Sequence, residues 1–369
     1  MGVERIELIQ LEIPYVHFFE TSFGREYSKS CLLVKAFSEG LCGYGEVVAD
    51  RAPLYSYETT ATAWLMLKEV FIPDVLEAGS DDPAGFYDRT RRFKGHSMAR
   101  AGLELALWDL AAKKQGISLS RLYGGDKREV LSGVSVGIQD SPEQLLDRIQ
   151  DFLDQGYPRV KIKIKPEWDV RICEAVRSRF PDILLQADAN ASYTLASMSL
   201  LKELDRFQLQ MLEQPFSGQD LWDHSRLQQE IQTPLCLDES AKSLDWVRQA
   251  RTMGSCRIIN IKVGRVGGIV EARKIHDFCR DQGMPVWCGG MLETGVGRAH
   301  NVHLASLPGF TLSNDISASS RYFHQDLVEP GFTLTEGGTI QVPRGPGIGV
   351  EPREDRIESC TLKREIFSA

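Results

Sequence analysis

Residues 159–165 read RVKIKIK, and four more apolar runs follow at regular intervals: ILLQADA (183–189), LQMLEQP (209–215), PLCLDES (234–240) and RIINIKV (257–263). Each run carries a charged residue near its end. Lys163, Asp188, Glu213 and Asp238 are each separated by 25 residues, and Lys262 follows after 24 more. One strand, one helix and two loops take about 25 residues. The five residues therefore occupy the same place on successive βα units, and in a parallel barrel that place is the C-terminal rim, where active sites form.

Acidic residues are common in loops, so a chance pattern has to be considered. With 51 Asp and Glu among 369 residues, three prescribed positions would all be acidic by chance roughly 0.3% of the time. Lysine at both flanking positions lowers that figure further. The pattern therefore indicates one site with three acids between two lysines.

Strand and helix patterns alternate from about Val130 onward. Further strands are predicted over 131–138, 285–291 and 310–315. Amphipathic stretches between the strands predict helices over 143–155, 169–180, 195–207, 243–250 and 270–282. No G-x-G-x-x-G follows an early strand, which disfavours a dinucleotide-binding sheet. About eight strands at this period predict an α/β fold, a modified TIM barrel of the (β/α)7β type, over residues 129–320.

Residues 1–128 have a different pattern and are predicted to form an α+β capping domain. Residues 5–14, 30–37 and 42–48 read as antiparallel strands, and helices are predicted over 57–116, the clearest of them with Ser97 as its N-cap. Residues 15–28 carry aromatic side chains beside Gly24 and are expected to form a mobile lid loop. The Gly- and Pro-rich residues 321–369 are expected to pack back on the cap and complete it.

The composition disfavours several functional classes. A net charge of −8 and a pI near 5.5 give no electrostatic reason to bind nucleic acid or an anionic membrane. No run of about 18 apolar residues predicts a membrane span. The eight cysteines form no C-x-x-C pair, and the N-terminal residues read as a strand, so we expect a cytoplasmic protein with reduced thiols.

Three lysines alternate along the strand at 159–165. Lys161, Lys163 and Lys165 are all expected to point into the barrel. Closely placed ammonium groups oppose one another's charging, which is expected to lower their pKa values toward neutrality. A lysine so adjusted can act as a base, and the spacing alone does not choose among the three.

The three acids predict a metal site. Carboxylates from successive strands are the hard oxygen ligands that Mg²⁺ prefers, whereas zinc would require His or Cys at these positions. A divalent cation opposite a lysine base is suited to removing a proton beside a carboxylate and stabilising the enediolate that results.

Short motifs in order along nearly the whole chain carry a family resemblance: ETSFGREYSK, GYGE, KGHSMARAGLELALWDL, KIKIKP, ADAN, LEQP, LDES, IKVGRVGG, GGMLETGVGRAHN, NDISASSRY and GPGIGVE. Together they resemble the muconate-lactonising branch of the enolase superfamily, and within it the o-succinylbenzoate synthase and N-acylamino acid racemase family.

The resemblance implies a role for each residue of the pattern. Mg²⁺, or Mn²⁺ or another divalent cation in its place, would be held by Asp188, Glu213 and Asp238. Lys163 and Lys262 would face opposite sides of the substrate α-carbon. The substrate would be bound by Lys161, Ser135, Ser22, Phe23, Gly290, Met291, Leu292 and Asp315.

Residues around this set are expected to support it. Asn190, Glu239 and Arg265 would lie behind the ligands and bases, although Glu239 could instead form an ion pair with Lys262. For Glu293 and His300 a structural hydrogen-bonding role is favoured. Trp287 and Cys288 stand where the mandelate-racemase branch has a histidine as its second base, which argues against that branch.

Two activities fit this site. In the synthase reaction, a step of menaquinone synthesis, Lys163 takes the α-proton of 2-succinyl-6-hydroxy-2,4-cyclohexadiene-1-carboxylate and then acts as the acid when hydroxide leaves, while Lys262 stays cationic. Racemisation of N-succinylamino acids needs both lysines. Arg265, three residues after Lys262, is expected to depress the pKa of that lysine, so racemase activity is expected beside synthase activity.

Other functions are weaker alternatives. A dedicated N-acylamino acid racemase comes next, followed by a muconate-type cycloisomerase and a dipeptide epimerase. An epimerase would resemble a site with an Asp-x-Asp pair where this chain has Ser313-Asn314-Asp315. A Schiff-base aldolase would leave the three acids unexplained, and a binding barrel would not need the lysines. The expected partners are a small carboxylate substrate and identical subunits in a homo-oligomer, with no nucleic acid and no membrane.

Overall fold

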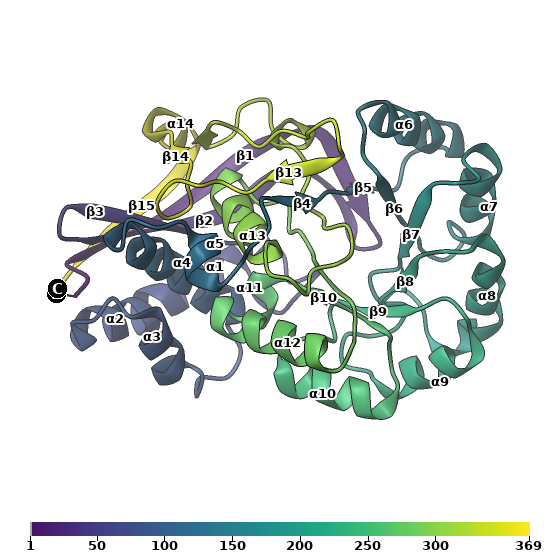
Figure 1. Ribbon diagram of the computed structural model, residues 1–369, viewed down its shortest axis with the longest axis horizontal. Helices are drawn as coiled ribbons and strands as arrows, with labels where there is room; N and C mark the ends of the chain where they lie inside the picture. Colours follow the sequence, from purple (N-terminus) through teal and green to yellow (C-terminus); the bar gives the residue numbers. More distant parts are fainter. Residues whose placement is uncertain (1) are drawn as a thin grey trace.

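The computed structural model describes residues 2–369 and has two parts, a cap and a curved βα barrel (Figure 1). The purple and blue N-terminal elements lie at the left of Figure 1, and the teal and green βα units curve around its right side. The yellow C-terminal segment returns to the purple strands. The rim of the barrel therefore meets segments from both ends of the chain.

The cap is built on one antiparallel sheet whose strand order is β15-β1-β2-β3. Its strands are β1 (Arg5–Thr21), β2 (Gly24–Ser38), β3 (Leu41–Val47) and β15 (Thr361–Ser368). Its helices are α1 (Thr60–Met66), a π-helical turn (Leu67–Phe71), α2 (Ile72–Ala78), α3 (Pro83–Thr90), α4 (Ser97–Lys114) and α5 (Leu119–Tyr123). The three antiparallel strands predicted at the start of the chain are confirmed.

Helix α4 lies directly on β3 because glycine removes the side chains between them. A Cβ atom at Gly45 would lie 2.0 Å from the carbonyl oxygen of Gly102, and one at Gly43 would lie 2.2 Å from that of Ala106. Glycine in a strand commonly marks such a close approach of two backbones. The G-Y-G motif is therefore the place where the main helix of the cap meets its sheet.

The barrel sheet has seven parallel strands in the order β11-β10-β9-β8-β7-β6-β5. They are β5 (Val134–Val136), β6 (Arg159–Lys163), β7 (Leu184–Asp188), β8 (Met211–Glu213), β9 (Leu235–Leu237), β10 (Ile258–Ile261) and β11 (Val286–Cys288). The helical segments after the strands are α6 (Pro142–Asp154), α7 (Val170–Arg179), α8 (Met198–Glu203) with flanking 3₁₀ turns (Leu195–Ser197 and Leu204–Phe207), α9 (Trp222–Glu230), α10 (Leu244–Met253), α11 (Val263–Val266), α12 (Ile269–Asp281) and α13 (Gly295–Ala305). Each predicted strand from 131 to 291 contains one of these strands, shorter than expected at its ends.

The eighth predicted strand, 310–315, is not a regular strand. Isolated parallel bridges pair Val286 with Phe310 and Ser132 with Asn314. The backbone N–H of Asp315 also donates to the carbonyl of Cys288, at 2.9 Å. The segment therefore contacts both edges of the sheet and closes the barrel irregularly, which fits the (β/α)7β architecture.

The predicted loop at 15–28 is instead an extended hairpin, here called the arm (residues 15–28). Strand β1 continues to Thr21 and β2 begins at Gly24, so only two residues form the turn. Phe19 pairs with Glu26 after an irregularity that follows Pro14. The prediction of a loop was wrong because aromatic and small residues near a glycine suggested irregular backbone, whereas cross-strand pairing extends almost to the tip.

Three barrel helices, α9, α11 and α13, were not predicted from the sequence, and the start of one cap helix was misplaced. Helix α11 is a single turn of four residues. Helix α13 is buried along its whole length, so it has no polar face to produce an amphipathic period. Helix α9 is short and strongly polar. Ser97 is the first helical residue of α4 and not its N-cap; the Glu58 carboxylate accepts from the N–H groups of Met98 and Ala99 instead.

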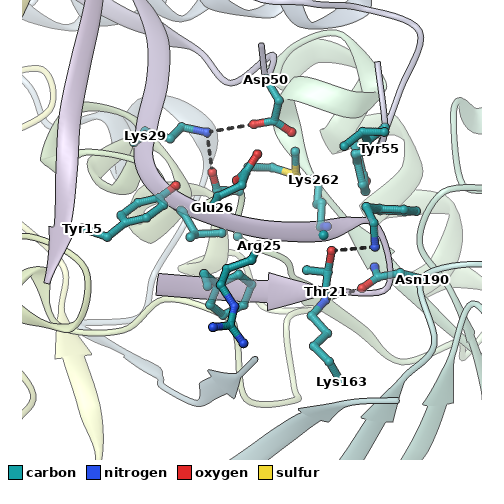
Figure 2. A pocket seen from close by; sticks show the side chains of 17 residues that line it. Tyr15, Thr21, Arg25, Glu26, Lys29, Asp50, Tyr55, Lys163, Asn190 and Lys262 are labelled. Carbon is teal, nitrogen blue, oxygen red and sulfur yellow. Dashed lines mark hydrogen bonds and ion pairs between the residues drawn. The ribbon is translucent and has the colours of Figure 1, made fainter. Parts of the chain in front are cut away.

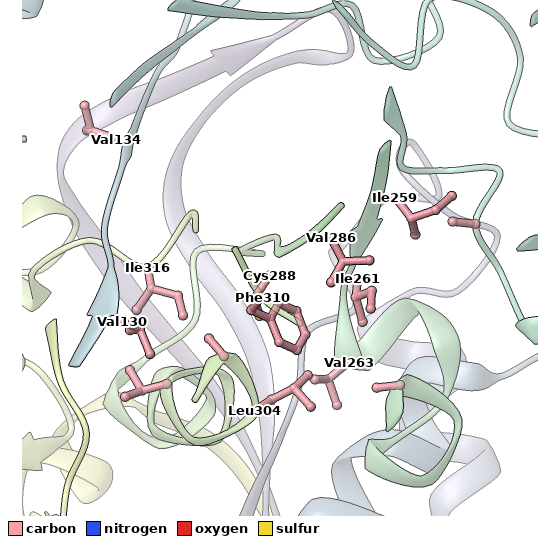
Figure 3. Packing of buried hydrophobic residues seen from close by; sticks show 14 of the residues in the cluster. Val130, Val134, Ile259, Ile261, Val263, Val286, Cys288, Leu304, Phe310 and Ile316 are labelled. Atoms are coloured by element: carbon pink, nitrogen blue, oxygen red, sulfur yellow. The ribbon is translucent and has the colours of Figure 1, made fainter. Parts of the chain in front are cut away.

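The main hydrophobic core lies between the barrel strands and their helices. Figure 3 shows one part of it, where Val286, Cys288 and Phe310 gather near Leu304 of α13. A smaller apolar cluster consists of Met211, Cys236, Ile258 and Trp287. Met211 and Cys236 each lie two residues before a predicted metal ligand, so side-chain alternation directs them to the same interior. The rim carboxylates thus stand next to an apolar interior.

The last strand of the chain joins the sheet of the cap. Two short antiparallel pairs, β12 (Val328–Glu329) with β14 (Glu351–Pro352) and β13 (Thr339–Gln341) with β4 (Glu129–Leu131), precede helix α14 (Glu354–Cys360). A 3₁₀ turn (Ser319–Arg321) lies before them. Strand β15 then pairs antiparallel with β1, Ser368 opposite Arg5.

Candidate active site

The five regularly spaced residues lie at the C-terminal ends of successive barrel strands, as the sequence predicted. Lys163, Asp188 and Glu213 are the last residues of β6, β7 and β8, and Asp238 and Lys262 directly follow β9 and β10. Lys163 pairs with Asp188 in register, and Asp188 with Glu213. The strand order places the two lysines at β6 and β10, with the three carboxylates on the strands between them.

Lys161 and Lys163 neutralise the carboxylates at one side of this row. Lys161 Nζ lies 2.8 Å from Glu213 Oε2, 3.2 Å from Asp188 Oδ2 and 2.7 Å from Asp315 Oδ2. Lys163 Nζ donates to Asp188 Oδ2 at 2.6 Å and to Asn190 Oδ1 at 2.8 Å. Both ammonium groups are thus held in fixed positions by two or more acceptors.

Asp238 is the centre of a second group of contacts. Lys262 Nζ lies 2.8 Å from its Oδ2, and Arg265 contacts its Oδ1. Tyr55 donates from its hydroxyl to the same Oδ1 at 3.0 Å, and Lys262 Nζ lies 4.6 Å from the centre of the Tyr55 ring. Lys262 therefore forms its ion pair with Asp238, and Asn190 donates to the alternative partner Glu239, at 3.2 Å.

The buried carboxylates at these strand ends have shifted pKa values. Burial, reinforced by the Asp188 carboxylate, raises the pKa of Glu213 to about 7. Burial followed by Asp238 and Asp188 raises the pKa of Glu239 to about 8, and Glu239 Oε2 has no hydrogen-bond partner among the described residues. Burial works against ionisation of Asp188 too, but Lys163 and Lys161 hold its pKa below its usual range.

The residues present fit a divalent cation by their chemistry. Asp188, Glu213 and Asp238 are almost fully buried, and they supply oxygen ligands only. Within residues 2–369 no three His, Cys, Asp or Glu side chains already stand at metal-binding spacing. Lys161 Nζ lies within 3.2 Å of both Asp188 and Glu213. Burial first, and the Asp188 carboxylate second, raise the pKa of Glu213. A cation bound beside it would oppose both effects by favouring the ionised carboxylate.

The expected lowering of the pKa toward neutrality is wrong for Lys161, and so is the expected lowering of the pKa of Lys262 by Arg265. Burial alone would lower the pKa of Lys161, but Asp315, Glu213 and Asp188 hold it well above its usual value. Asp238 likewise holds the pKa of Lys262 above its usual value, against the effect of burial. Carboxylates within 3.2 Å outweigh the repulsion from nearby cations on which both predictions relied.

A cavity of about 310 Å³ opens onto these strand ends (Figure 2). Of the predicted residues, those on its wall are Phe23, Lys163, Asn190, Lys262, Gly290, Met291 and Leu292. The arm adds Tyr15, Phe19, Thr21, Gly24, Arg25 and Glu26, and β2 adds Lys29 just beyond the arm. The segment after β3 adds Asp50, Leu54 and Tyr55. Both lysines therefore reach one cavity, and the cap closes it.

Other predicted residues lie outside the wall of the cavity. Ser22 donates to the carbonyl of Asn190 at 3.2 Å. Ser135 donates to Asp315 Oδ2 at 3.0 Å, and Asp315 also forms an ion pair with Arg159 at 2.8 Å. Lys165 leaves the cluster and forms an ion pair with Glu20 at 3.4 Å, so the structure separates it from Lys161 and Lys163.

The residues that the sequence reading missed all come from the cap. Tyr15, Glu26, Lys29, Asp50 and Tyr55 belong to segments whose contact with the barrel rim has no local signature. Lys29 alone gave a sign, a lysine directly before the apolar run SCLLV. It is only 2% exposed and donates to the carbonyl of Met291 at 2.8 Å.

His300 has the structural role that was favoured for it. It is fully buried on α13, its Nε2 lies 2.9 Å from the carbonyl oxygen of Tyr44 and its Nδ1 lies 3.2 Å from the hydroxyl of Tyr123. Burial lowers its pKa to about 4. It therefore joins barrel to cap away from the cavity.

All eight cysteines are free thiols, as expected, and seven of them are buried. Among the described residues, no helix is both long and apolar enough to cross a membrane.

The chain is similar in sequence and in structure to known proteins. The model "Mandelate racemase / muconate lactonizing enzyme, N-terminal domain" matches residues 6–124, and "Enolase C-terminal domain-like" matches 144–356. The chain is 46% identical over 368 residues to the o-succinylbenzoate synthase of Geobacillus stearothermophilus, covering 100% of this chain and 98% of that protein. It is 45% identical over 369 residues to the N-succinylamino acid racemase of Thermus thermophilus, covering 100% of both. A crystal structure of an enolase superfamily member from Listeria innocua, 42% identical, superposes with a TM-score of 0.95 over 100% of this chain and 99% of that one.

Proposed function

Because the chain belongs to the mandelate racemase/muconate lactonizing enzyme family of the enolase superfamily, we propose that it is an o-succinylbenzoate synthase that also racemises N-succinylamino acids. One observation carries the proposal: Lys163 and Lys262 reach one cavity from strands that flank three buried carboxylates. That arrangement serves proton removal beside a substrate carboxylate. Relatives of both names are about equally similar to this chain over its full length.

Lys163 is the proposed base of the dehydration. Its Nζ takes the α-proton and returns a proton to the departing hydroxide, so that water leaves and the ring becomes aromatic. The Asp188 and Asn190 acceptors orient this amine. Lys262 stays cationic beside Asp238 and stabilises the negative charge that develops on the substrate. The raised pKa of Lys262 supports this cationic role.

Asp188, Glu213 and Asp238 are the proposed ligands of Mg²⁺, for which Mn²⁺ or another divalent cation can substitute. When bound, the cation would supply positive charge that favours the enediolate form of the substrate carboxylate. Lys161 is proposed to contact the substrate carboxylate once its own carboxylate partners are shared with the cation. Asn190, Glu239 and Arg265 hold the bases and ligands in place.

The synthase is tested by following the ultraviolet absorbance of the cyclohexadiene substrate, with Mg²⁺ and with EDTA. We expect turnover that requires the metal and that falls on the order of 10³-fold or more in Lys163→Ala. Lys165→Ala is the matched control, because Lys165 pairs with Glu20 and lies off the cavity wall; it should retain most of the activity. Equal loss in both variants would contradict the assignment of the base.

The racemase is tested by exchange of the α-proton of an N-succinylamino acid with deuterium. Both lysines must act for full racemisation, so Lys163→Ala and Lys262→Ala should each abolish it. Exchange without synthase turnover would favour the alternative, a dedicated racemase. Absence of exchange beside rapid dehydration would remove the second activity. Trapping of a substrate adduct by borohydride would instead reveal a Schiff-base aldolase.

Several further features are part of the proposal. The domains are proposed to be 1–128 and 129–320, with 321–369 completing the cap, and the arm is proposed to move as a lid. The partners are a small carboxylate substrate and further copies of this chain, and the location is the cytoplasm. Sedimentation of the purified protein tests the assembly; a single 41.4 kDa species would contradict it.

A further inference from the structure

The cavity has a second charged group of residues, at the end away from Lys163. Figure 2 shows Glu26, Lys29 and Asp50 grouped at one end and Lys163 with Asn190 at the other. Glu26 comes from the arm and Asp50 from the segment that follows β3. Neither has a part in the proton transfers proposed above.

The charges of this group do not balance. Lys29 Nζ lies 3.7 Å from Asp50 Oδ1, but its hydrogen bond goes to the carbonyl of Met291. Among residues 2–369 Glu26 forms no ion pair and no side-chain hydrogen bond. The nearby arginines are engaged elsewhere: Arg25 pairs with Glu20 and Asp140, and Arg51 with Glu12. One buried ammonium thus faces two carboxylates.

The pKa shifts of nearby groups agree with an excess of negative charge in this group. Glu26 is exposed at the surface, but partial desolvation of its carboxylate, then Asp50, raises its pKa, and Lys29 and Arg51 only partly offset them. Tyr15 lies close enough to both carboxylates that, after burial, Glu26 and Asp50 are the next causes that raise its pKa. Tyr15 and Phe19 therefore line the cavity beside the two acids, which combines aromatic faces with negative charge.

We propose that Glu26 and Asp50 determine which amino-acid side chain the racemase reaction accepts, and that they select a cationic one, such as the guanidinium of N-succinylarginine or the ammonium of N-succinyllysine. A guanidinium fits best because it donates to two carboxylates at once and stacks on aromatic rings. The inference rests on the proposed function and names its substrate class.

The test compares N-succinyl-L-arginine with N-succinyl-L-citrulline, which has nearly the same shape without the charge. Both the rate of α-deuterium exchange and the affinity by calorimetry are measured for each compound. Loss of one close charge pair at a partly exposed site costs roughly tenfold or more. The wild type should therefore prefer the arginine compound by at least about tenfold in both measurements.

The variants are compared by the ratio of the value for the arginine compound to that for the citrulline compound. A loss of activity toward both compounds then cancels. In Glu26→Gln/Asp50→Asn the ratio of arginine to citrulline compound should fall to near one, and in each single variant it should fall part of the way. Glu77→Gln on α2 removes an equal charge from outside the cavity wall. It should keep the wild-type ratio.

Three outcomes are informative. A wild-type ratio near one in exchange and in affinity overturns the inference, and if synthase turnover is normal the proposed function still stands. If the wild type shows neither dehydration nor α-proton exchange with any substrate, the proposed function is overturned. The ratio of the affinities for the arginine and citrulline compounds then still tests whether Glu26 and Asp50 select a cationic side chain. Faster reaction of the double variant with all substrates, the cyclohexadiene included, would mean that Lys29 binds a substrate carboxylate, and this too overturns it.

Discussion

Arg265 was expected to depress the pKa of Lys262 by its own charge, but the structure gives it an indirect route. Both cations contact one carboxylate, Asp238, through different oxygens. If Arg265 is removed, Lys262 is the one cation left on Asp238 beside the Tyr55 hydroxyl, which makes that ammonium harder to deprotonate.

We therefore expect Arg265→Met to reduce N-succinylamino acid exchange at least about tenfold more than dehydration, since only racemisation needs Lys262 as a base. The two kcat/KM values measured on one preparation check this. Arg265→Lys should restore part of the exchange. Equal losses in both reactions would show that Arg265 serves only to hold Asp238 in place.

Among single residues, the sequence predicted those candidate site residues that recur at the same position of each βα unit. Lys163, Asp188 and Lys262 could be placed on one rim because a fixed period relates strand ends without any knowledge of packing. Glu26 and Asp50 could not, because they reach the cavity through the docking of the cap on the barrel. That contact joins residues far apart in sequence and leaves no periodic pattern.

The close packing of helix α4 on strand β3 predicts that a side chain added between them lowers the free energy of unfolding. Gly45→Ala would place a methyl group 2.0 Å from the Gly102 carbonyl oxygen, so the helix or the strand must shift. Overpacking of this kind costs about 1–3 kcal/mol, and more where backbone opposes it. Urea unfolding should show a loss in or above that range.

Gly337→Ala is the control for this substitution, because its nearest neighbour would be 3.8 Å away. It should change the free energy of unfolding by no more than about 0.5 kcal/mol. Equal losses of stability in the two variants would contradict a local clash at Gly45 as the cause.

Helices were predictable from the sequence when one face of the helix was polar. The helices α6, α10 and α12 were placed within a few residues, whereas α13 was missed because every side is buried. The segment 310–315 was read as a regular strand, yet it closes the barrel with isolated bridges. Burial on all sides and irregular pairing both remove the periods on which sequence patterns rely.

The joining of cap and barrel by His300 concerns the whole molecule and predicts a pH dependence. Burial lowers the folded-state pKa of His300 to about 4, while the unfolded chain keeps a value of about 6.5. The unfolded state thus binds more protons between these values, so stability is full above pH of about 6.5 and is lost as pH falls toward 4.

The shift corresponds to about 3 kcal/mol. We expect the stability of the wild type relative to His300→Gln to fall by about this amount between pH 7 and pH 4, measured by urea unfolding at several pH values. Comparison of the two proteins cancels the contributions of other buried groups, such as Glu46 and Glu104. Parallel curves would contradict a neutral buried histidine.

The pairing of β15 with β1 has a consequence for the order in which the molecule is made. At roughly 5–20 residues per second, a ribosome needs about 20–70 s to proceed from the first strand to residues 361–368, its partner. The barrel sequence emerges in that interval, while one edge of β1 has no neighbour, and such an edge can pair with other chains. The sheet that carries the arm is therefore finished last, and the nascent chain is exposed to misassembly throughout the synthesis of the strands that carry its candidate active site.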